Sequence, residues 1–271
     1  MSAAALAEPV IWLTSRLDDG PDNAPVLVLG NSLGTSRMVW DEQAAAFGER
    51  FRLFRYELPG HDGVPSPHPP PPYSIGQLGA SVLDLLDWFG VERAAYCGVS
   101  LGGMIGMWLA AHAPDRISAL GLVCTSAYLP PADGWRARAE LVTADGLRPV
   151  MAASLERWFP PGFAEREPEV VAAFATELGR VDPTGYAGCC LAIADMDLRG
   201  DLAKIKAPTL VISGGRDPST PPEHGALIAD GIGGARLLVV DDAAHLANVS
   251  SPEVVTAALL EHLTSRSDRR E

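Results

Sequence analysis

The sequence of 271 residues contains no apolar run that approaches the roughly 20 residues needed to cross a bilayer. It also lacks a basic excess, because 21 Lys and Arg residues face 34 Asp and Glu residues, a net charge of -13. This charge argues against nucleic acid and anionic membranes as partners. Metal and nucleotide motifs are missing as well: there is no H-x-x-x-H pattern, Cys/His cluster, Walker loop or G-x-G-x-x-G. We therefore expect no metal and no cofactor.

Cysteine is scarce, and the four residues show no C-x-x-C spacing: Cys97, Cys124, Cys189 and Cys190. Unpaired cysteine usually behaves as a small apolar side chain, and reducing compartments keep it unpaired. We therefore expect reduced thiols in the core. The segment Met1–Thr14 has no basic stretch and its apolar residues are interrupted, so it does not predict a secretory signal. These features predict a cytoplasmic location.

Short β-rich segments alternate with helical patterns, which is typical of βαβ units and of a mostly parallel sheet. The run Val26–Leu29 is apolar at every position, as expected for a strand buried on both faces. Ser74 and Gln77 form a capping-box pattern that begins one helix, and Leu101–Ala113 predicts another that ends at Pro114. The predicted strands are Val10–Ser15, Val26–Leu29, Phe51–Tyr56, Ala94–Gly98, Ala119–Cys124, Thr209–Ser213 and Arg236–Val240.

Two segments break this alternation. The prolines from Pro65 to Pro72 predict an extended surface loop. Residues 127–206 contain helical pieces and several aromatic residues but no convincing strand, and about 80 residues is too long for a plain loop. We interpret residues 127–206 as a helical cap on a core formed by residues 1–126 and 207–271. The alternative is a set of additional core helices.

The strongest local signal is the G-x-S-x-G pattern Gly98-Val99-Ser100-Leu101-Gly102, between a predicted strand and a predicted helix. This is the context of a nucleophile elbow, a sharp strand-to-helix turn that needs glycine on both sides of the serine. The turn lifts the serine hydroxyl clear of the carboxyl edge of the sheet. A helix N-terminus there favours developing negative charge. Ser100 is the predicted nucleophile.

A serine hydroxyl is a weak nucleophile and needs a base. Of the six histidines, His245 is the best placed, because it lies in the loop after the predicted strand Arg236–Val240, at the same carboxyl edge as Ser100. By contrast, His112 and His262 fall on predicted helices. We therefore predict His245 as the base.

The imidazole in turn needs an acid that fixes its tautomer. Asp217 directly follows the predicted strand Thr209–Ser213, and the chain order Ser, Asp, His is the order that this strand-turn-helix architecture uses. We predict Asp217 as the acid. The competing residues fall inside or at the edge of the predicted cap, or too close to His245 along the chain: Asp195, Asp197, Asp201, Asp241 and Asp242.

Hydrolysis by a serine also needs donors for the oxyanion of the tetrahedral intermediate. The backbone N–H of Leu101, the residue after the nucleophile, is one predicted donor. The other is expected from the loop after Val26–Leu29, where the backbone of Leu33 is the first choice and that of Ser32 the second. The alternative interpretation of this loop is a plain turn.

Taken together, several segments resemble the 3-oxoadipate enol-lactonases, and the resemblance extends from about residue 13 to residue 263. It implies an α/β-hydrolase fold, with a mostly parallel central sheet flanked by helices and a helical cap. The Asn31–Thr35 loop and two cap segments are its more specific parts. The segments are Asn31–Thr35, Arg55-Tyr56 with Pro59–His61, Gly98–Gly103, Pro114–Ile117, Leu155–Phe159, Gly185–Cys190 and Gly214–Pro218.

The resemblance implies hydrolysis of the enol-lactone of 3-oxoadipate, in the β-ketoadipate route of aromatic catabolism, by the same three residues. That small-molecule substrate carries a carboxylate. The family places a Trp and an Arg close together in the cap, and Trp135 and Arg138 match them. The resemblance thus implies that Arg138 pairs with the carboxylate and that Trp135 forms a wall of the pocket. The alternative for Arg138 is a solvated surface side chain.

The sequence departs from the family pattern in one stretch. Glu57 stands where the family has Asp, Pro59 where it has Arg, and Asp62 is an insertion. This difference leaves the three catalytic candidates alone but is expected to reshape one rim of the pocket, which bears on the substrate.

Other activities on the same scaffold are the alternatives: a carboxylesterase, a carbon–carbon bond hydrolase or a cofactor-free haloperoxidase. A haloalkane dehalogenase would need Asp at the position of Ser100. A non-catalytic small-molecule receptor is the alternative from another class, and the intact set of catalytic candidates argues against it.

Overall fold

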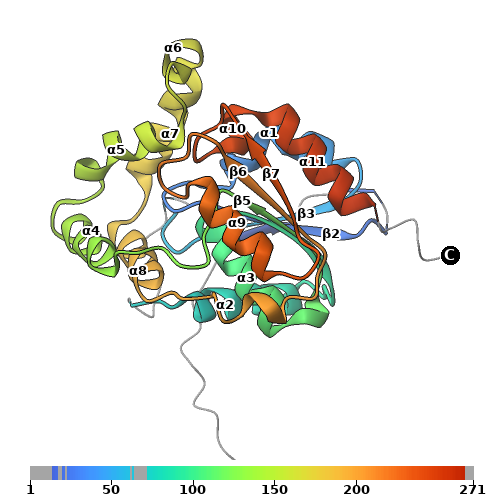
Figure 1. Cartoon of the computed structure of the whole chain (residues 1–271). Helices are drawn as coiled ribbons and strands as arrows, with labels where there is room; N and C mark the ends of the chain where they lie inside the picture. The colour runs from blue at the N-terminus through green and yellow to red at the C-terminus, as the bar shows by residue number, and fades with distance from the viewer. Residues whose placement is uncertain (1–13, 18–19, 22, 62, 64–71, 266–271) are drawn as a thin grey trace, which may run out of the picture.

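The computed structural model describes residues 14–17, 20–21, 23–61, 63 and 72–265 of the chain (Figure 1). Within them, one sheet of seven strands has the order β1-β3-β2-β4-β5-β6-β7. β1 runs antiparallel to β3, and the other neighbouring strands are parallel. The strands are β1 (Thr14–Leu17), β2 (Val26–Gly30), β3 (Arg52–Glu57), β4 (Ala94–Val99), β5 (Ile117–Val123), β6 (Thr209–Gly214) and β7 (Arg236–Val240).

Helices cover both faces of the sheet, which explains why its central strands are so apolar. Every residue of β2, β4 and β6 is buried, as expected for parallel strands with both faces covered. One face is covered by α2 (Ile75–Trp88), α3 (Leu101–His112) and α9 (Pro222–Gly231), and the other by α1 (Asp41–Gly48) and α11 (Pro252–Thr264) (Figure 1). The short elements are η1 (Arg37–Trp40), η2 (Pro114–Arg116), η3 (Leu202–Lys204) and α10 (Ala247–Ser250).

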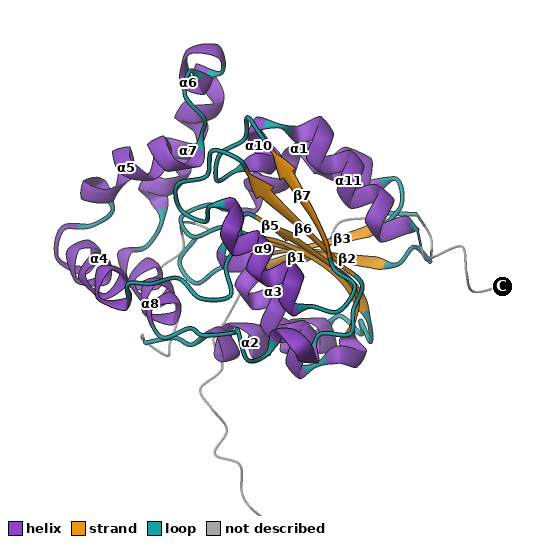
Figure 2. Cartoon of the chain, in the orientation of Figure 1, coloured by secondary structure: helices purple, strands orange, loops and turns teal. Residues whose placement is uncertain are grey.

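A helical region is inserted between β5 and β6. Figure 2 shows the arrows of β6 and β7 pointing toward the side on which this region lies. Its two ends lie side by side, because Tyr128 and Asp197 form an antiparallel bridge and the Leu198 N–H donates to the Ala127 carbonyl at 2.8 Å. The inserted helices are α4 (Ala132–Asp145), α5 (Arg148–Trp158), α6 (Phe163–Arg166), α7 (Pro168–Arg180) and α8 (Pro183–Ala194).

The predicted fold class and the predicted helical insertion are both confirmed. Six of the predicted strands agree with β2 to β7 to within two residues at either end. The first, Val10–Ser15, overlaps β1 at residues 14 and 15, and its residues 10–13 lie outside the described residues. The predicted proline loop lies almost entirely outside them too, since residues 64–71 are not described. The antiparallel direction of β1 has no signal in its short sequence.

The four cysteines are buried and their thiols are free, as predicted. Burial raises the pKa of each thiol, and that of Cys190 reaches about 12. Cys124 corrects one predicted boundary: it lies just beyond β5, with a positive φ of 45° that takes it out of the strand. Among the described residues, no helix has both the length and the apolar character required to cross a membrane.

The capping box of α2 is present as predicted and can be tested. The Gln77 N–H donates to Ser74 Oγ at 3.1 Å, and the Ser74 N–H donates to Gln77 Oε1 at 3.0 Å. Replacing Ser74 with Ala leaves a helix N–H without its acceptor, so we expect the free energy of unfolding to fall by about 1 kcal/mol. Ser74→Gly should lower the free energy of unfolding by only a few tenths of a kcal/mol, because glycine is itself tolerated at this position. Urea unfolding measures the free energy of unfolding of both variants, provided that its slope is unchanged, and a Ser74→Ala variant as stable as the wild type would contradict this role of the hydroxyl.

Candidate active site

Ser100 lies at the sharp turn between β4 and α3, where the backbone is strained. Its φ of 54° and ψ of -114° belong to a region that residues other than glycine rarely adopt. Surrounding hydrogen bonds hold the turn in place: the Ser100 N–H donates to the Val123 carbonyl at 2.9 Å, and Thr125 Oγ1 donates to the Ser100 carbonyl at 2.6 Å. Such strain persists only where neighbouring structure enforces it, and it is concentrated at functional sites.

Two glycines of the G-x-S-x-G pattern are required by close backbone contacts. A Cβ atom on Gly98 would lie 2.3 Å from the carbonyl carbon of Gly102. A Cβ atom on Gly102 would lie 2.4 Å from the carbonyl carbon of Gly30, at the end of β2. No side chain fits at either distance, so both positions need glycine.

Asp217 and His245 come together at the carboxyl ends of β6 and β7. His245 Nδ1 lies 2.8 Å from Asp217 Oδ2. Asp217 also accepts hydrogen bonds from Thr220 Oγ1 at 2.7 Å and from the backbone N–H groups of Ser219 and Thr220 at 2.8 and 3.1 Å. Burial raises the pKa of Asp217, but the charge of His245 and these hydrogen bonds outweigh it and lower the pKa overall. The carboxylate is therefore ionised and accepts the hydrogen bond from His245 Nδ1, so that in the neutral form of this imidazole Nε2 is the acceptor.

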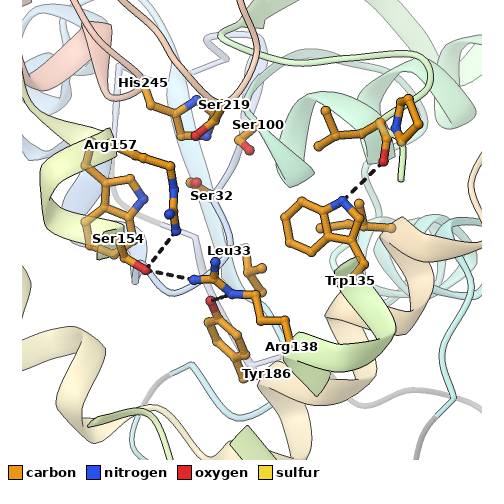
Figure 3. A pocket seen from close by; sticks show the side chains of 14 residues that line it. Ser32, Leu33, Ser100, Trp135, Arg138, Ser154, Arg157, Tyr186, Ser219 and His245 are labelled. Carbon is orange, nitrogen blue, oxygen red and sulfur yellow. Dashed lines mark hydrogen bonds between the residues drawn. The ribbon is translucent and has the colours of Figure 1, made fainter. Parts of the chain in front are cut away.

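Ser100 and His245 both line one pocket of about 230 Å³ (Figure 3). Among the described residues, no hydrogen bond joins the Ser100 hydroxyl to the imidazole. Catalytic hydrogen bonds often shorten only once substrate is bound. The backbone of the His245 loop is tied to the end of α5, because the His245 and Leu246 N–H groups donate to the carbonyls of Arg157 and Trp158 at 3.3 and 2.9 Å.

The two predicted oxyanion donors are buried and available. Thr35 N–H donates to the Ser32 carbonyl at 3.1 Å, which closes a tight turn after β2 with Leu33 inside it. Leu33 and Ser32 line the pocket. In the part of the chain that the structure describes, the backbone N–H groups of Leu33 and Leu101 donate to no protein acceptor. Buried N–H groups without an acceptor are rare, so both can serve an oxygen atom of a ligand.

The stretch that departs from the family pattern lies beneath this turn. Glu57 is buried and accepts hydrogen bonds from Asn31 Nδ2 and from the Arg37 N–H, both at 2.9 Å. Asn31 Nδ2 donates also to the Tyr56 carbonyl at 2.9 Å. On the other side, the Gly102 N–H donates to the Asn31 carbonyl at 2.9 Å. Glu57 therefore supports the turn formed by Ser32–Thr35, which we call the oxyanion turn. Asp62 lies outside the described residues.

Trp135 and Arg138 line the same pocket as Ser100. Arg138 is fixed in place: its Nε donates to Tyr186 Oη at 2.9 Å and its Nη2 to Ser154 Oγ at 2.8 Å. Its guanidinium carbon lies 5.9 Å from the centroid of the Trp135 ring. Both residues come from α4, and Tyr186 comes from α8.

A second arginine, Arg157, was missed by the sequence analysis. Figure 3 shows Arg157 and Arg138 approaching Ser154 from two sides, and the Arg157 Nη2 lies 3.5 Å from Ser154 Oγ. Burial, and then the positive charge of Arg138, lower the pKa of Arg157. Among the described residues, neither guanidinium forms a salt bridge with a carboxylate. The signal that could have identified Arg157 was its place in the matching segment Leu155–Phe159.

Four of the five aspartates considered as competitors of Asp217 pair with other residues. Asp195 pairs with Arg136, Asp197 with Arg199, and Asp201 with Lys204. All three pairs lie at the surface of the inserted region or its boundary. Asp242 pairs with Arg216 at 2.6 Å.

Comparison with known proteins agrees with this geometry. A family model described as the alpha/beta hydrolase fold matches residues 25–252. The chain is 38% identical over 240 residues to 3-oxoadipate enol-lactonase 2 of Acinetobacter baylyi, with 89% of each chain covered. It is 35% identical to 3-oxoadipate enol-lactonase 1 of the same organism, with 87% of each covered.

Among solved structures, the enol-lactonase from Burkholderia xenovorans LB400 superposes with a TM-score of 0.89 at 39% identity. The match covers 93% of this chain and 96% of that one. This chain therefore belongs to the α/β-hydrolase superfamily and, within it, to the family of the 3-oxoadipate enol-lactonases.

Proposed function

We propose that this protein is a serine hydrolase that opens the enol-lactone of 3-oxoadipate to 3-oxoadipate. The observation that carries the proposal is the composition of one pocket: a strained serine and an imidazole at one end, and two arginines without a salt-bridge partner among the described residues at the other. Such a pocket suits a small molecule that is both an ester and an anion. Identity to two enol-lactonases over most of the chain supports the same substrate.

In the first half of the reaction, Ser100 Oγ attacks the lactone carbonyl and its proton passes to His245 Nε2. Asp217 stabilises the resulting imidazolium through its hydrogen bond to Nδ1. The backbone N–H groups of Leu33 and Leu101 bind the oxyanion of the tetrahedral intermediate. The ring C–O bond then breaks, the departing enolate oxygen takes the proton from His245, and the enol becomes a ketone. This tautomerisation makes ring opening favourable.

In the second half, water attacks the acyl group on Ser100. His245 takes a proton from that water and returns it to the serine oxygen as the C–O bond to Ser100 breaks. The product is a dicarboxylate with a ketone, and the free enzyme is regenerated. No group other than water enters the reaction.

The two arginines bind the substrate carboxylate. The protein carries a net charge of -13, so its overall field repels an anion and a local positive site must attract it. Arg138 is already oriented by Tyr186 and Ser154, which reduces the entropy lost when it binds a carboxylate. Arg157 adds a second cation to the same end of the pocket.

Residues 127–206 act as the cap that supplies this anion site, and residues 1–126 and 207–271 act as the core that supplies the nucleophile and the base. We place the reaction in the β-ketoadipate route of aromatic catabolism. Four buried free thiols suit a reducing compartment such as the cytoplasm.

A substrate comparison tests the anion site and the proposed function together. The protein should hydrolyse the enol-lactone of 3-oxoadipate with a far higher kcat/KM than p-nitrophenyl acetate. Arg138→Ala and Arg157→Ala should each lower kcat/KM for the lactone by about 10- to 100-fold, mainly through KM, because each removes a charged hydrogen-bond donor. For the methyl ester of the same lactone, kcat/KM should fall by less than about threefold in both variants, since this substrate lacks the negative charge.

Arg180→Ala is the matched control, because Arg180 lies exposed on α7, away from the pocket lining. The Arg180→Ala variant should leave kcat/KM unchanged for both the lactone and its methyl ester. Equal losses for the acid and its methyl ester would remove the arginines from carboxylate binding. A strong preference for p-nitrophenyl acetate would overturn the enol-lactone as substrate and favour a carboxylesterase.

The catalytic residues have a separate test. A fluorophosphonate should label Ser100, mapped by peptide mass spectrometry, and Ser100→Ala should abolish labelling. Asp217→Asn should lower kcat by about 10⁴-fold with a much smaller change in KM, because an amide no longer fixes the His245 tautomer. Wild-type protein that is folded but remains unlabelled at Ser100 would instead favour the non-catalytic receptor.

A further inference from the structure

His61 lies beside the turn that carries the Leu33 N–H, and the proposed mechanism gives it no role. It is buried, with 2% of its surface exposed. Its Nδ1 lies 2.9 Å from the Pro59 carbonyl oxygen, and the Gly34 N–H donates to its Nε2 at 2.9 Å. A carbonyl oxygen can only accept, so Nδ1 must carry the proton and Nε2 must present a lone pair. The two contacts together define a neutral ring in one tautomer.

The Gly34 N–H belongs to the central peptide of the oxyanion turn. The turn runs from Ser32 to Thr35, closed by the Thr35 N–H to Ser32 carbonyl bond, and Gly34 has φ of 84° at its third position while Leu33 keeps a negative φ. This is the pattern of a type II turn, in which the central peptide is flipped relative to a type I turn. By accepting the Gly34 N–H, His61 fixes the direction of that peptide.

The other side of the His61 ring faces the inserted helical region. Its plane lies 14° from that of Tyr186, with centroids 6.3 Å apart, and Tyr186 Oη accepts the bond from Arg138 Nε. The neighbouring backbone is joined to the start of α8, since the Asp182 N–H donates to the Gly60 carbonyl at 2.8 Å. His61 thus lies between the oxyanion turn and the residue that orients Arg138.

We propose that His61 is a positioning residue for catalysis: its Nε2 lone pair anchors the Gly34 N–H and so fixes the place of the Ser32–Thr35 turn, in which the neighbouring Ser32–Leu33 peptide carries the Leu33 N–H that faces the reacting carbonyl oxygen. The proposal rests on the proposed serine hydrolase function, because the oxyanion turn matters only if Ser100 attacks an ester. It applies to any ester that the site accepts, since every tetrahedral intermediate carries the same oxyanion.

Two amide substitutions separate the two contacts of the ring. The amide group of Gln reaches the place of Nε2, so His61→Gln keeps an acceptor for the Gly34 N–H. The shorter Asn reaches only the place of Nδ1, so His61→Asn keeps the bond to the Pro59 carbonyl and loses the one to Gly34. We expect His61→Asn to lower kcat by about 10- to 100-fold, somewhat less than the loss of a whole oxyanion donor. KM should stay within about threefold, and His61→Gln should recover most of the rate.

Three measurements apply to both variants and to the wild type: kcat and KM on the enol-lactone, the same on p-nitrophenyl acetate, and the rate of Ser100 labelling by a fluorophosphonate. The thermal unfolding midpoint is recorded beside them. Loss of rate in His61→Asn and recovery in His61→Gln, at similar midpoints, supports positioning. Rates that fall equally in both variants, or that follow the midpoints, overturn it and leave His61 a purely structural role.

Failure of the proposed function gives a different result. If the wild type hydrolyses p-nitrophenyl acetate and is labelled at Ser100 but ignores the enol-lactone, the substrate is wrong and the His61 comparison is still decided on the neutral ester. If folded wild type is not labelled at all, the nucleophile itself is wrong, and the role of His61 falls with it.

Discussion

The contact on which the active site depends is the close approach of two backbones, at Gly30 on the end of β2 and Gly102 in the first turn of α3. Their separation leaves no room for a Cβ atom on Gly102, and the Gly102 N–H is bonded to the Asn31 carbonyl beside it. Because Leu33 lies two residues after Asn31 and Leu101 directly precedes Gly102, this contact sets the distance between the two proposed oxyanion donors. It also anchors the helix whose N-terminus carries Ser100. The proposed site for developing negative charge therefore consists of backbone N–H groups, whose positions depend on this backbone contact and not on side chains.

Side chains then divide the pocket into two ends with different chemistry. The end formed by the sheet is the proposed reacting end, where the Asp217 carboxylate, with its lowered pKa, keeps one tautomer of His245. The end formed by α4, α5 and α8 is the proposed binding end, where Arg138 and Arg157 lie together in a protein that is negative overall. Burial lowers the pKa of Arg157, and repulsion by the nearby positive charge of Arg138 lowers it further. An anionic group bound between the two guanidinium groups relieves the repulsion between them. The binding energy of this non-reacting part of the ligand can then contribute to the reaction at the other end of the pocket.

The strands and the residues proposed for catalysis could be predicted from sequence because each has a local pattern. G-x-S-x-G marks Ser100, and Asp217 and His245 each follow a strand closely. Parallel strands end at one edge of a sheet, so three distant segments could be expected to meet.

The supporting residues could not be found in this way. Glu57 and His61 act on a turn more than 20 residues earlier, and Arg157 enters the pocket only because of how α5 packs. Their roles follow from the direction in which side chains point after packing, and no spacing rule encodes that direction. Glu57 was expected to reshape one rim of the pocket. The side chain is buried and supports the oxyanion turn by accepting a hydrogen bond from the Arg37 N–H.

The bonds from the His245 and Leu246 N–H groups to the last carbonyls of α5 have a consequence for how such an enzyme can diversify. The inserted region is therefore needed by the core, because its removal would take away the two backbone hydrogen bonds that hold the His245 loop. A descendant that lost the insertion would lose turnover along with selectivity. Change of substrate in this lineage is therefore expected to proceed by exchange of individual side chains on α4, α5 and α8, with the main chain of the insertion retained.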